Sequence, residues 1–172
     1  MSAELPDDAS LKGMSLHSFT ATALFERTFD EGMRLVEECA RYLDGRGRDE
    51  SRELPRKSAL VYAGESMRVT TRLMQAASWL LIQRAVQEGD MTSEDAASDR
   101  YRLGAREICM GKREEGMDSL PKKLLELLER SESLYRRVAR LDDILLRQGE
   151  TSDGVKSHFA MLEAAFGQAD HK

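Results

Sequence analysis

Three histidines and two cysteines are the side chains of this chain best suited to bind a metal or act as nucleophiles. They are His17, His158, His171, Cys39 and Cys109. None of the histidines has a cysteine or a second histidine at the short spacing that zinc sites use. Two cysteines are too few for a disulfide scaffold, so we expect both to be reduced and partly buried. The sequence therefore predicts no metal site and no cofactor.

Phosphate-binding and nucleophile motifs are also missing. Gly111 and Lys112 have the order found in a phosphate loop, but Arg106 stands at the first glycine position and Arg113 at the hydroxyl position. The sequence contains no G-x-S-x-G nucleophile motif. No pair of carboxylates is predicted to share an apolar pocket, as general acid and base catalysis would require. We expect a protein that is not an enzyme.

A group of arginines in the third predicted helix favours nucleic acid as a partner, and Lys122, Lys123 and the base-rich connector 46–57 add to it. Five acidic residues lie in the same segment, and Tyr135 is the only aromatic side chain there that could stack on a base. Acid-before-base pairs such as Glu126 with Arg130 are typical of a solvated helix face. The formal net charge of −5 also argues against nucleic acid. The arginines are Arg130, Arg136, Arg137, Arg140 and Arg147.

The segment 55–88 is the most distinctive element, and it predicts one long central helix. Pro55 opens the segment, Gly89 closes it, and no second proline lies between them. Residues at helical spacing mark the stripe that we expect to face the core. That stripe comprises Ala63, Met67, Thr70, Met74, Ala77 and Leu81, widened by Tyr62, Val69, Leu73 and Leu80.

A second apolar group lies on the other side of the same predicted helix. Residues 100–110 could cover this group as a loop, or a second copy or another protein could bind it. Both alternatives remain open. In the second, the interface residues are Trp79, Ile82 and Val86, with Arg72 and Gln75 beside them.

The other elements predicted by periodicity are also helical. We expect an all-α fold, a three-helix antiparallel bundle with a long central helix and flexible termini. Its helices span about 20–43, 55–88 and 119–148, and the third has a core face of Leu120, Leu124, Leu127, Leu134, Val138, Leu141 and Leu145. A charged connector covers 44–54, an irregular connector covers 90–118, and a flexible arm covers 1–18.

The last segment, 149–172, is predicted to be a flexible tail because Gly149 and Gly154 interrupt the helical pattern before it. Beyond the glycines, a short amphipathic pattern remains. It could dock on the bundle or bind a groove of a partner. The docking candidates are Val155, Phe159, Leu162 and Phe166.

Length and composition describe one soluble domain. The chain has 172 residues, of which 33% are charged and 41% hydrophobic. Its first residues have no basic start and no apolar run, unlike a signal peptide. The longest uncharged apolar run, 73–83, is far shorter than the roughly 20 residues of a membrane span. We therefore expect no membrane association and a cytoplasmic location.

Several strings in the sequence resemble the RcdA family, named for regulation of CtrA degradation in alphaproteobacteria. The resemblance covers residues 20–148 and is strongest between 42 and 88. It comprises YLDG at 42–45, RELPR at 52–56, ESMR at 65–68, TTRLMQ at 70–75, ASWLL at 77–81 and LYRRVARL at 134–141.

This resemblance implies a small helical bundle that forms a homodimer and has no enzymatic activity. Family members act as adaptors that connect the ClpXP protease to particular substrates, including cell-cycle transcription factors. An adaptor needs only two differently directed surfaces, because tethering by itself raises the local concentration of the substrate. Two alternatives stay open on the residues alone, namely a helical DNA-associated regulator and a structural dimerisation module.

Overall fold

The computed structural model describes residues 23–112 and 115–166, with side chains described up to residue 146. Within these residues all regular structure is helical, which confirms the all-α prediction. The described residues contain more helices than the three expected, because short helices also occupy both connectors. The α-helices are α3 (Ala23–Asp44), α4 (Arg46–Glu53), α5 (Arg56–Glu88), α6 (Ser93–Ala96), α7 (Arg106–Met110) and α8 (Lys122–Phe166), with 3₁₀ turns at Asp99–Tyr101 and Met117–Ser119.

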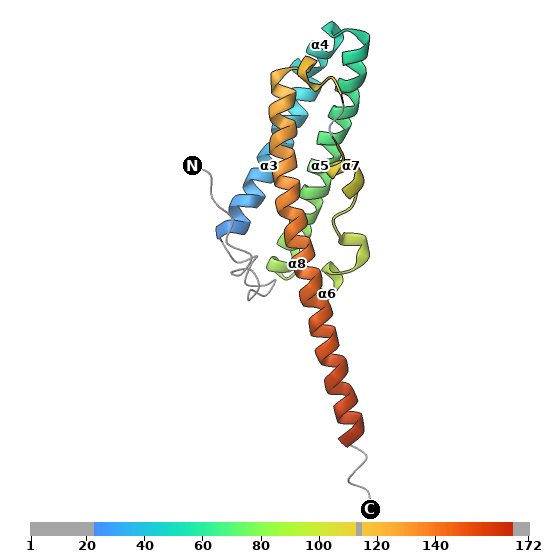
Figure 1. Cartoon of the computed structure of the whole chain (residues 1–172). Helices are drawn as coiled ribbons and strands as arrows, with labels where there is room; N and C mark the ends of the chain where they lie inside the picture. Colours follow the sequence, from blue (N-terminus) through green and yellow to red (C-terminus); the bar gives the residue numbers. More distant parts are fainter. Residues whose placement is uncertain (1–22, 113–114, 167–172) are drawn as a thin grey trace, which may run out of the picture.

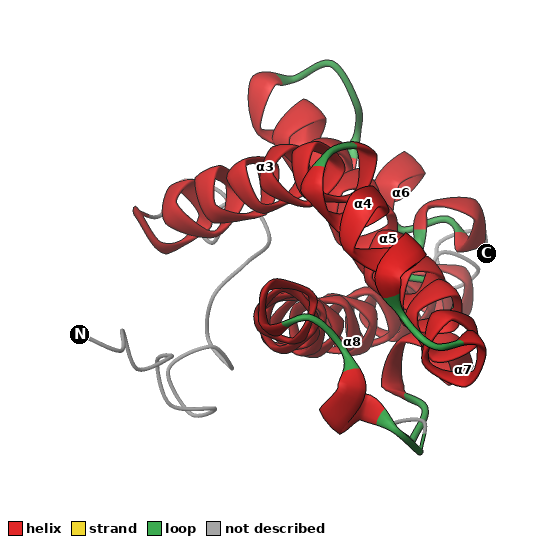
Figure 2. Ribbon diagram, turned by 90° about the horizontal axis from the view of Figure 1, so that it is seen from above, coloured by secondary structure: helices red, strands yellow, loops and turns green. Residues whose placement is uncertain are grey.

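The three long helices α3, α5 and α8 pack along one another, and α5 contacts both of the others. Seen from above, α3 and α8 lie on different sides of α5 (Figure 2). Helix α3 is antiparallel to α5, because Glu26 pairs with Arg84 at one end and Tyr42 lies near Tyr62 at the other.

Helix α8 runs in the same direction as α5, so the expected antiparallel order is wrong for this pair. Arg72 contacts Leu128, and further along both helices Trp79 contacts Asp142. The connector between α5 and α8 returns along the length of α5 before α8 begins (Figure 1). The expectation of antiparallel neighbours assumed a short connection, whereas this connector is long enough to cross the whole bundle.

Helix α5 has the boundaries that its terminal residues predicted. Pro55 precedes the first turn, and Gly89 ends the helix with a φ of 82°, a left-handed conformation that costs glycine least. The N–H of Gly89 donates to the carbonyl of Val86 at 3.2 Å, which satisfies one of the last free acceptors of the helix.

The charged connector 44–54 contains a helix, α4, that periodicity did not reveal. Its inward contacts come from glycine and polar groups rather than from large apolar residues. Gly47 is buried against Tyr42 and Tyr62, and the hydroxyl of Tyr42 donates to Oε2 of Glu50 at 2.8 Å. A helix held in this way has no apolar stripe for a sequence pattern to detect.

The core face of α8 is confirmed. Leu124, Leu127, Leu134 and Val138 are fully buried, Leu120 and Leu141 nearly so, and Leu145 packs against their edge. From α3 and α5, the fully buried apolar side chains of Phe25, Leu35, Val69 and Leu80 belong to the same core cluster.

Helix α8 does not end near residue 148, and the predicted tail begins as part of it. The helix continues through Gly149 and Gly154 to Phe166, and its last portion extends beyond the other helices (Figure 1). Two glycines cost about 1 kcal/mol each, too little to break a long helix by themselves. The predicted arm 1–18 and the last residues of the tail, 167–172, lie outside the described residues.

Candidate interaction surface

One side of α5 holds the connector against the bundle through a row of polar side chains. We call Arg68, Arg72, Gln75 and Trp79 the connector clamp. The first three bind the connector directly, and Trp79 binds Asp142 of α8, which in turn pairs with Arg106 of the connector. Arg68 donates to the carbonyls of Gly111 and Lys112 at 3.0 and 2.8 Å. These contacts fix the end of α7 against the first half of α5.

Arg72 is the most buried member of the connector clamp, with 2% of its surface exposed. Its Nε donates to the carbonyl of Cys109 at 2.7 Å, and Nη1 donates to the carbonyl of Leu128 at 3.2 Å. Nη2 lies 3.6 Å from the carboxylate of Glu132. One guanidinium thereby joins α5, α7 and α8.

The clamp continues along α5 with Gln75. Oε1 of Gln75 accepts the N–H of Gly104 at 2.9 Å, and the hydroxyl of Tyr135 on α8 donates to the carbonyl of Gly104 at 2.7 Å. Gly104 is thus held from two helices at once. The last member of the clamp is Trp79, whose Nε1 donates to Oδ1 of Asp142 at 2.9 Å.

Asp142 also connects the clamp to the basic part of the connector. Arg106 lies 3.4 Å from Asp142 and 2.6 Å from Asp143. The hydrogen bond with Asp143 raises the pKa of Arg106. Asp142 itself is only 5% exposed, so its charge is compensated by the indole and by arginines rather than by water.

Burial shifts the pKa values of Arg72 and of both cysteines. It lowers the pKa of Arg72, an effect that the charge of Glu132 opposes. Burial also raises the pKa of the Cys109 thiol and raises that of Cys39 to about 11. Both cysteines are free and buried, and the raised pKa values keep them as unreactive thiols.

The five interface candidates on α5 do not form an exposed patch. Trp79, Val86 and Arg72 are buried, and Ile82 and Gln75 are half-buried. This side of α5 faces the bundle: residues 104 and 109 of the connector bind Gln75 and Arg72, in line with the alternative of a covering loop at 100–110, and Asp142 of α8 binds Trp79. Contact with a partner stays a prediction only for the partly exposed Ile82 and Gln75.

The stripe assigned to the core divides between two faces of α5. The residues that widened it, Tyr62, Val69, Leu73 and Leu80, are buried as expected, whereas its central residues Met67, Met74 and Leu81 lie on the outer face. Leu60, Met67, Met74 and Leu81 are 75%, 68%, 64% and 52% exposed. Among the residues whose side chains are described, the only other exposed large apolar residues are Ile108 and Met110 of α7. Ala63, a smaller residue of the stripe, and its neighbour Gly64 are exposed as well. Such a concentration of exposed apolar side chains marks an interaction surface.

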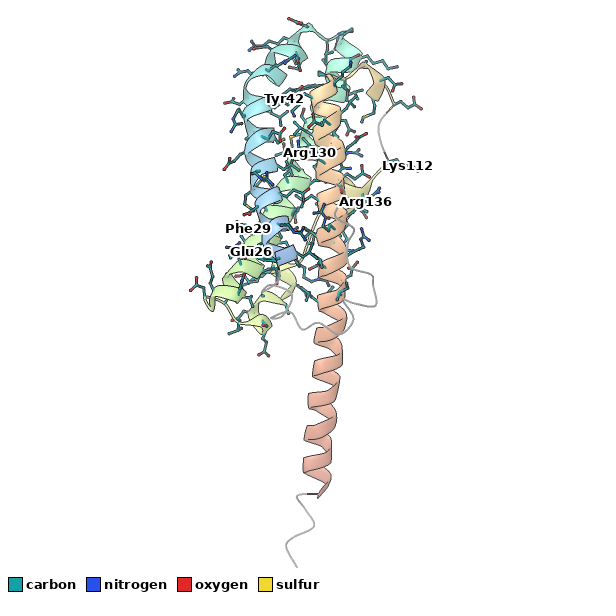
Figure 3. All side chains as sticks on the ribbon, turned by 90° about the vertical axis from the view of Figure 1, so that its left-hand side faces the viewer. Glu26, Phe29, Tyr42, Lys112, Arg130 and Arg136 are labelled. Atoms are coloured by element: carbon teal, nitrogen blue, oxygen red, sulfur yellow. The ribbon has the colours of Figure 1, made fainter. Side chains whose placement is uncertain are left out.

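Three of the five α8 arginines that favoured nucleic acid, Arg130, Arg136 and Arg137, are held in ion pairs, whereas Arg140 is exposed. Arg130 contacts Glu126 and, across to α3, Glu38. Arg130 and Arg136 both lie along α8 (Figure 3). Arg136 pairs with Glu132, and Arg137 pairs with Glu31 of α3. The predicted i,i+4 pairs are therefore present for Glu126 and Glu132, and the side chain of Arg147 is not described.

The described part of the chain shows neither a metal site nor a membrane span. Where side chains are described, no three His, Cys, Asp or Glu residues are placed to hold a metal ion. None of the described helices is apolar enough over a sufficient length to cross a membrane. His17 and His171 lie outside the described residues. The side chains of His158 and of Val155, Phe159, Leu162 and Phe166 lie in the part of α8 described by its backbone.

Comparison with known proteins places this arrangement in a family. Residues 16–166 match a family model described as Protein of unknown function (DUF1465). A solved structure, that of RcdA from Caulobacter crescentus CB15, is 52% identical, with a TM-score of 0.61. The match covers 75% of this chain and 96% of that chain. The chain belongs to the RcdA family. No curated protein matches it significantly.

Membership of the RcdA family agrees with the resemblance found in the sequence. The strings that carry that resemblance include the ends of α3 and α4 and the middle of α5. They contain Arg68, Arg72, Gln75 and Trp79, so the whole connector clamp lies within them.

Proposed function

We propose that this protein is a non-enzymatic adaptor that connects the ClpXP protease to particular substrates, including cell-cycle transcription factors such as CtrA. The observation that carries the proposal is the 52% identity with RcdA over nearly the whole of that chain. As implied by the resemblance, we propose that the adaptor works as a homodimer in the cytoplasm.

The arrangement of surfaces supports this role. The apolar outer face of α5 and the projecting end of α8 are separate, differently directed parts of one helical body. Two such surfaces allow one protein to hold a protease and a substrate together, which raises the local substrate concentration without new chemistry. The paired arginines of α8 support the DNA-associated alternative less, because their charges are already compensated.

A degradation assay with purified components tests the proposal. CtrA would be incubated with ClpXP, ATP and any priming factor that the protease requires, with and without this protein, and substrate loss followed over time. We expect faster loss of CtrA when the protein is present. A ClpXP substrate that needs no adaptor is the matched control, and its rate should not change.

Crosslinking in cells provides an independent test. Capture of ClpX together with a transcription factor supports the adaptor role. Capture of DNA-bound complexes, with affinity that falls steeply as salt rises, would favour the DNA-associated alternative. Unchanged CtrA degradation in the assay, with only a second copy of the chain captured in cells, would leave the structural dimerisation module as the better explanation.

A further inference from the structure

The outer face of α5 has a regular spacing of large and small residues. The four exposed large side chains, those of Leu60, Met67, Met74 and Leu81, follow one another seven residues apart. Small residues fill the positions between them, namely Ala63, Gly64, Thr70, Thr71, Ala77 and Ser78. Large residues every seven positions, separated by small ones, are typical of a helix that packs along a second helix.

The same residues are also symmetric about the midpoint between Thr70 and Thr71. Counting outward in both directions pairs methionine with methionine and leucine with leucine, and it pairs small residues with small residues. The pairs are Thr70 with Thr71, Met67 with Met74, Gly64 with Ala77, Ala63 with Ser78, and Leu60 with Leu81. When a helix meets a second copy of itself in antiparallel orientation about a two-fold axis, each residue lies level with its symmetric counterpart.

The polar and charged side chains in the middle of α5 are bonded within the protein and do not make this face polar. The hydroxyls of Thr70 and Thr71 donate to the carbonyls of Ser66 and Met67 in their own helix, each at 2.8 Å. Between Lys57 and Arg84 the charged residues of α5 are Glu65, Arg68 and Arg72. Glu65 and Arg72 are buried and Arg68 is bound to the connector. The centre of the face therefore carries no free charge, as expected in the middle of an interface.

The charges at the two ends of α5 favour an antiparallel partner. Arg56 lies at the start of the helix and Glu88 at its end, and both are exposed. In an antiparallel pair centred on Thr70 and Thr71, Arg56 of one copy lies within about one helical turn of Glu88 of the other. A parallel pair would instead bring each end next to its own like charge.

We propose that the outer face of α5 binds the same face of a second copy, antiparallel, with the two-fold axis passing between Thr70 and Thr71. A Cβ added at Gly64 would meet nothing within 4 Å in the single chain, so there is room for close approach of a second helix at this point. The inference rests on the homodimer of the proposed function and assigns its surface, orientation and register.

Cysteine crosslinking tests the register, because both native cysteines are buried. Thr70→Cys and Thr71→Cys should each form a disulfide-linked dimer, since these positions lie next to the axis. Leu60→Cys and Leu81→Cys should not crosslink alone, because the two copies of each residue would be roughly 30 Å apart. A mixture of the Leu60→Cys and Leu81→Cys proteins should crosslink. Crosslinking of each alone would show a parallel pair and overturn the orientation.

Charge substitution tests the surface itself. Met67→Glu with Met74→Glu should weaken the dimer by about 100-fold or more, measured by sedimentation. Circular dichroism should show unchanged helix content, because both side chains are exposed. Ser133→Glu with Arg140→Glu is the matched control. It places acids at exposed positions of α8, the helix that covers the side of α5 opposite the outer face, and should leave the dimer intact.

Other outcomes separate this inference from the adaptor proposal. If the Met67→Glu, Met74→Glu protein remains a dimer, the assigned surface is wrong. If the wild-type protein is a monomer but the substitutions abolish delivery of CtrA, the face belongs to a different partner and the adaptor proposal survives. If the substitutions give a folded monomer while the wild-type protein fails to accelerate CtrA degradation, the dimer surface stands and the adaptor proposal fails.

Discussion

Trp79 and Asp142 form a buried hydrogen bond between two parallel helices. The indole Nε1 donates to the carboxylate Oδ1 at 2.9 Å, although the residues lie 63 positions apart in the sequence. Both residues are at most 5% exposed. The bond connects the last third of α5 with α8, and it shares Asp142 with arginines of the connector.

Trp79→Phe should lower the free energy of unfolding by about 1–3 kcal/mol, because it keeps an aromatic ring but leaves a buried acceptor without its donor. Urea denaturation followed by circular dichroism measures the loss. A double-mutant cycle with Asp142→Ala isolates the pair. A coupling energy below about 0.5 kcal/mol would mean that the bond contributes nothing beyond packing.

Arg72→Met should be more damaging, at about 3–5 kcal/mol, because the carbonyls of Cys109 and Leu128 and the nearby carboxylate of Glu132 all lose this donor. Arg72→Lys should restore little, since one ammonium cannot reach three acceptors in different directions. Amide hydrogen exchange in 105–112 should accelerate in both variants. The exposed Arg34→Met on α3 is the control, with an expected change within about 0.5 kcal/mol.

Two glycine substitutions should have opposite effects on stability. Gly47→Ala places a Cβ 2.6 Å from the hydroxyl oxygen of Tyr62 and 2.7 Å from the ring of Tyr42, so we expect a loss of about 1–3 kcal/mol. Gly64→Ala meets no atom and should stabilise α5 by up to about 1 kcal/mol. Thermal denaturation in the Met67→Glu, Met74→Glu background compares the two changes without self-association. Equal effects of the two changes would be inconsistent with these contacts.

The contact between α3 and α8 should make stability sensitive to acid. Hydrogen bonds from Lys123 and Arg130 lower the pKa of Glu38 from its ordinary value of 4.5. A carboxyl with a lowered folded-state pKa contributes fully above its unfolded pKa, and the contribution disappears as pH falls through the folded pKa. Glu38→Gln should therefore reduce the loss of stability below about pH 5, by up to about 1 kcal/mol for such partly exposed pairs. Denaturation midpoints at pH 3 to 7 test this, and identical pH profiles for the two proteins would contradict it.

Local signals in the sequence predicted the helix ends and one core face well. Pro55 and Gly89 bounded α5 because each acts on the backbone of its own turn. The leucines of α8 identified its inner face because polar residues fill the other sides of that helix. Which face of α5 points outward could not be predicted in the same way, because this helix is apolar on two faces.

Periodicity shows which residues share a face of α5, but it does not show which face meets a neighbour. The inner face carries the buried polar residues Glu65, Arg72 and Gln83, whereas the outer face carries Leu60 and both methionines. Hydrophobicity therefore assigned Val69, Leu73 and Leu80 correctly to the core but placed Met67, Met74 and Leu81 there as well, although these three are exposed. The orientation of α5 is decided by contacts such as that of Arg72 with the carbonyl of Cys109, which join segments far apart in the sequence. These segments meet because the connector returns along α5 before α8 begins.

The parallel course of α5 and α8 also has a consequence for the order of folding. Helices α3 and α5 form a hairpin through a short connection, whereas the hydrogen bonds of α8 with α5 and α3 join residues as far apart as 56 and 106 positions. Closing such long loops costs entropy before any contact repays it, and non-local contacts of this kind slow folding. We expect the α3–α5 hairpin to form first, while α8 is still being synthesised, and α8 to dock in the rate-limiting step. The clamp on the connector would then be among the last structures to form.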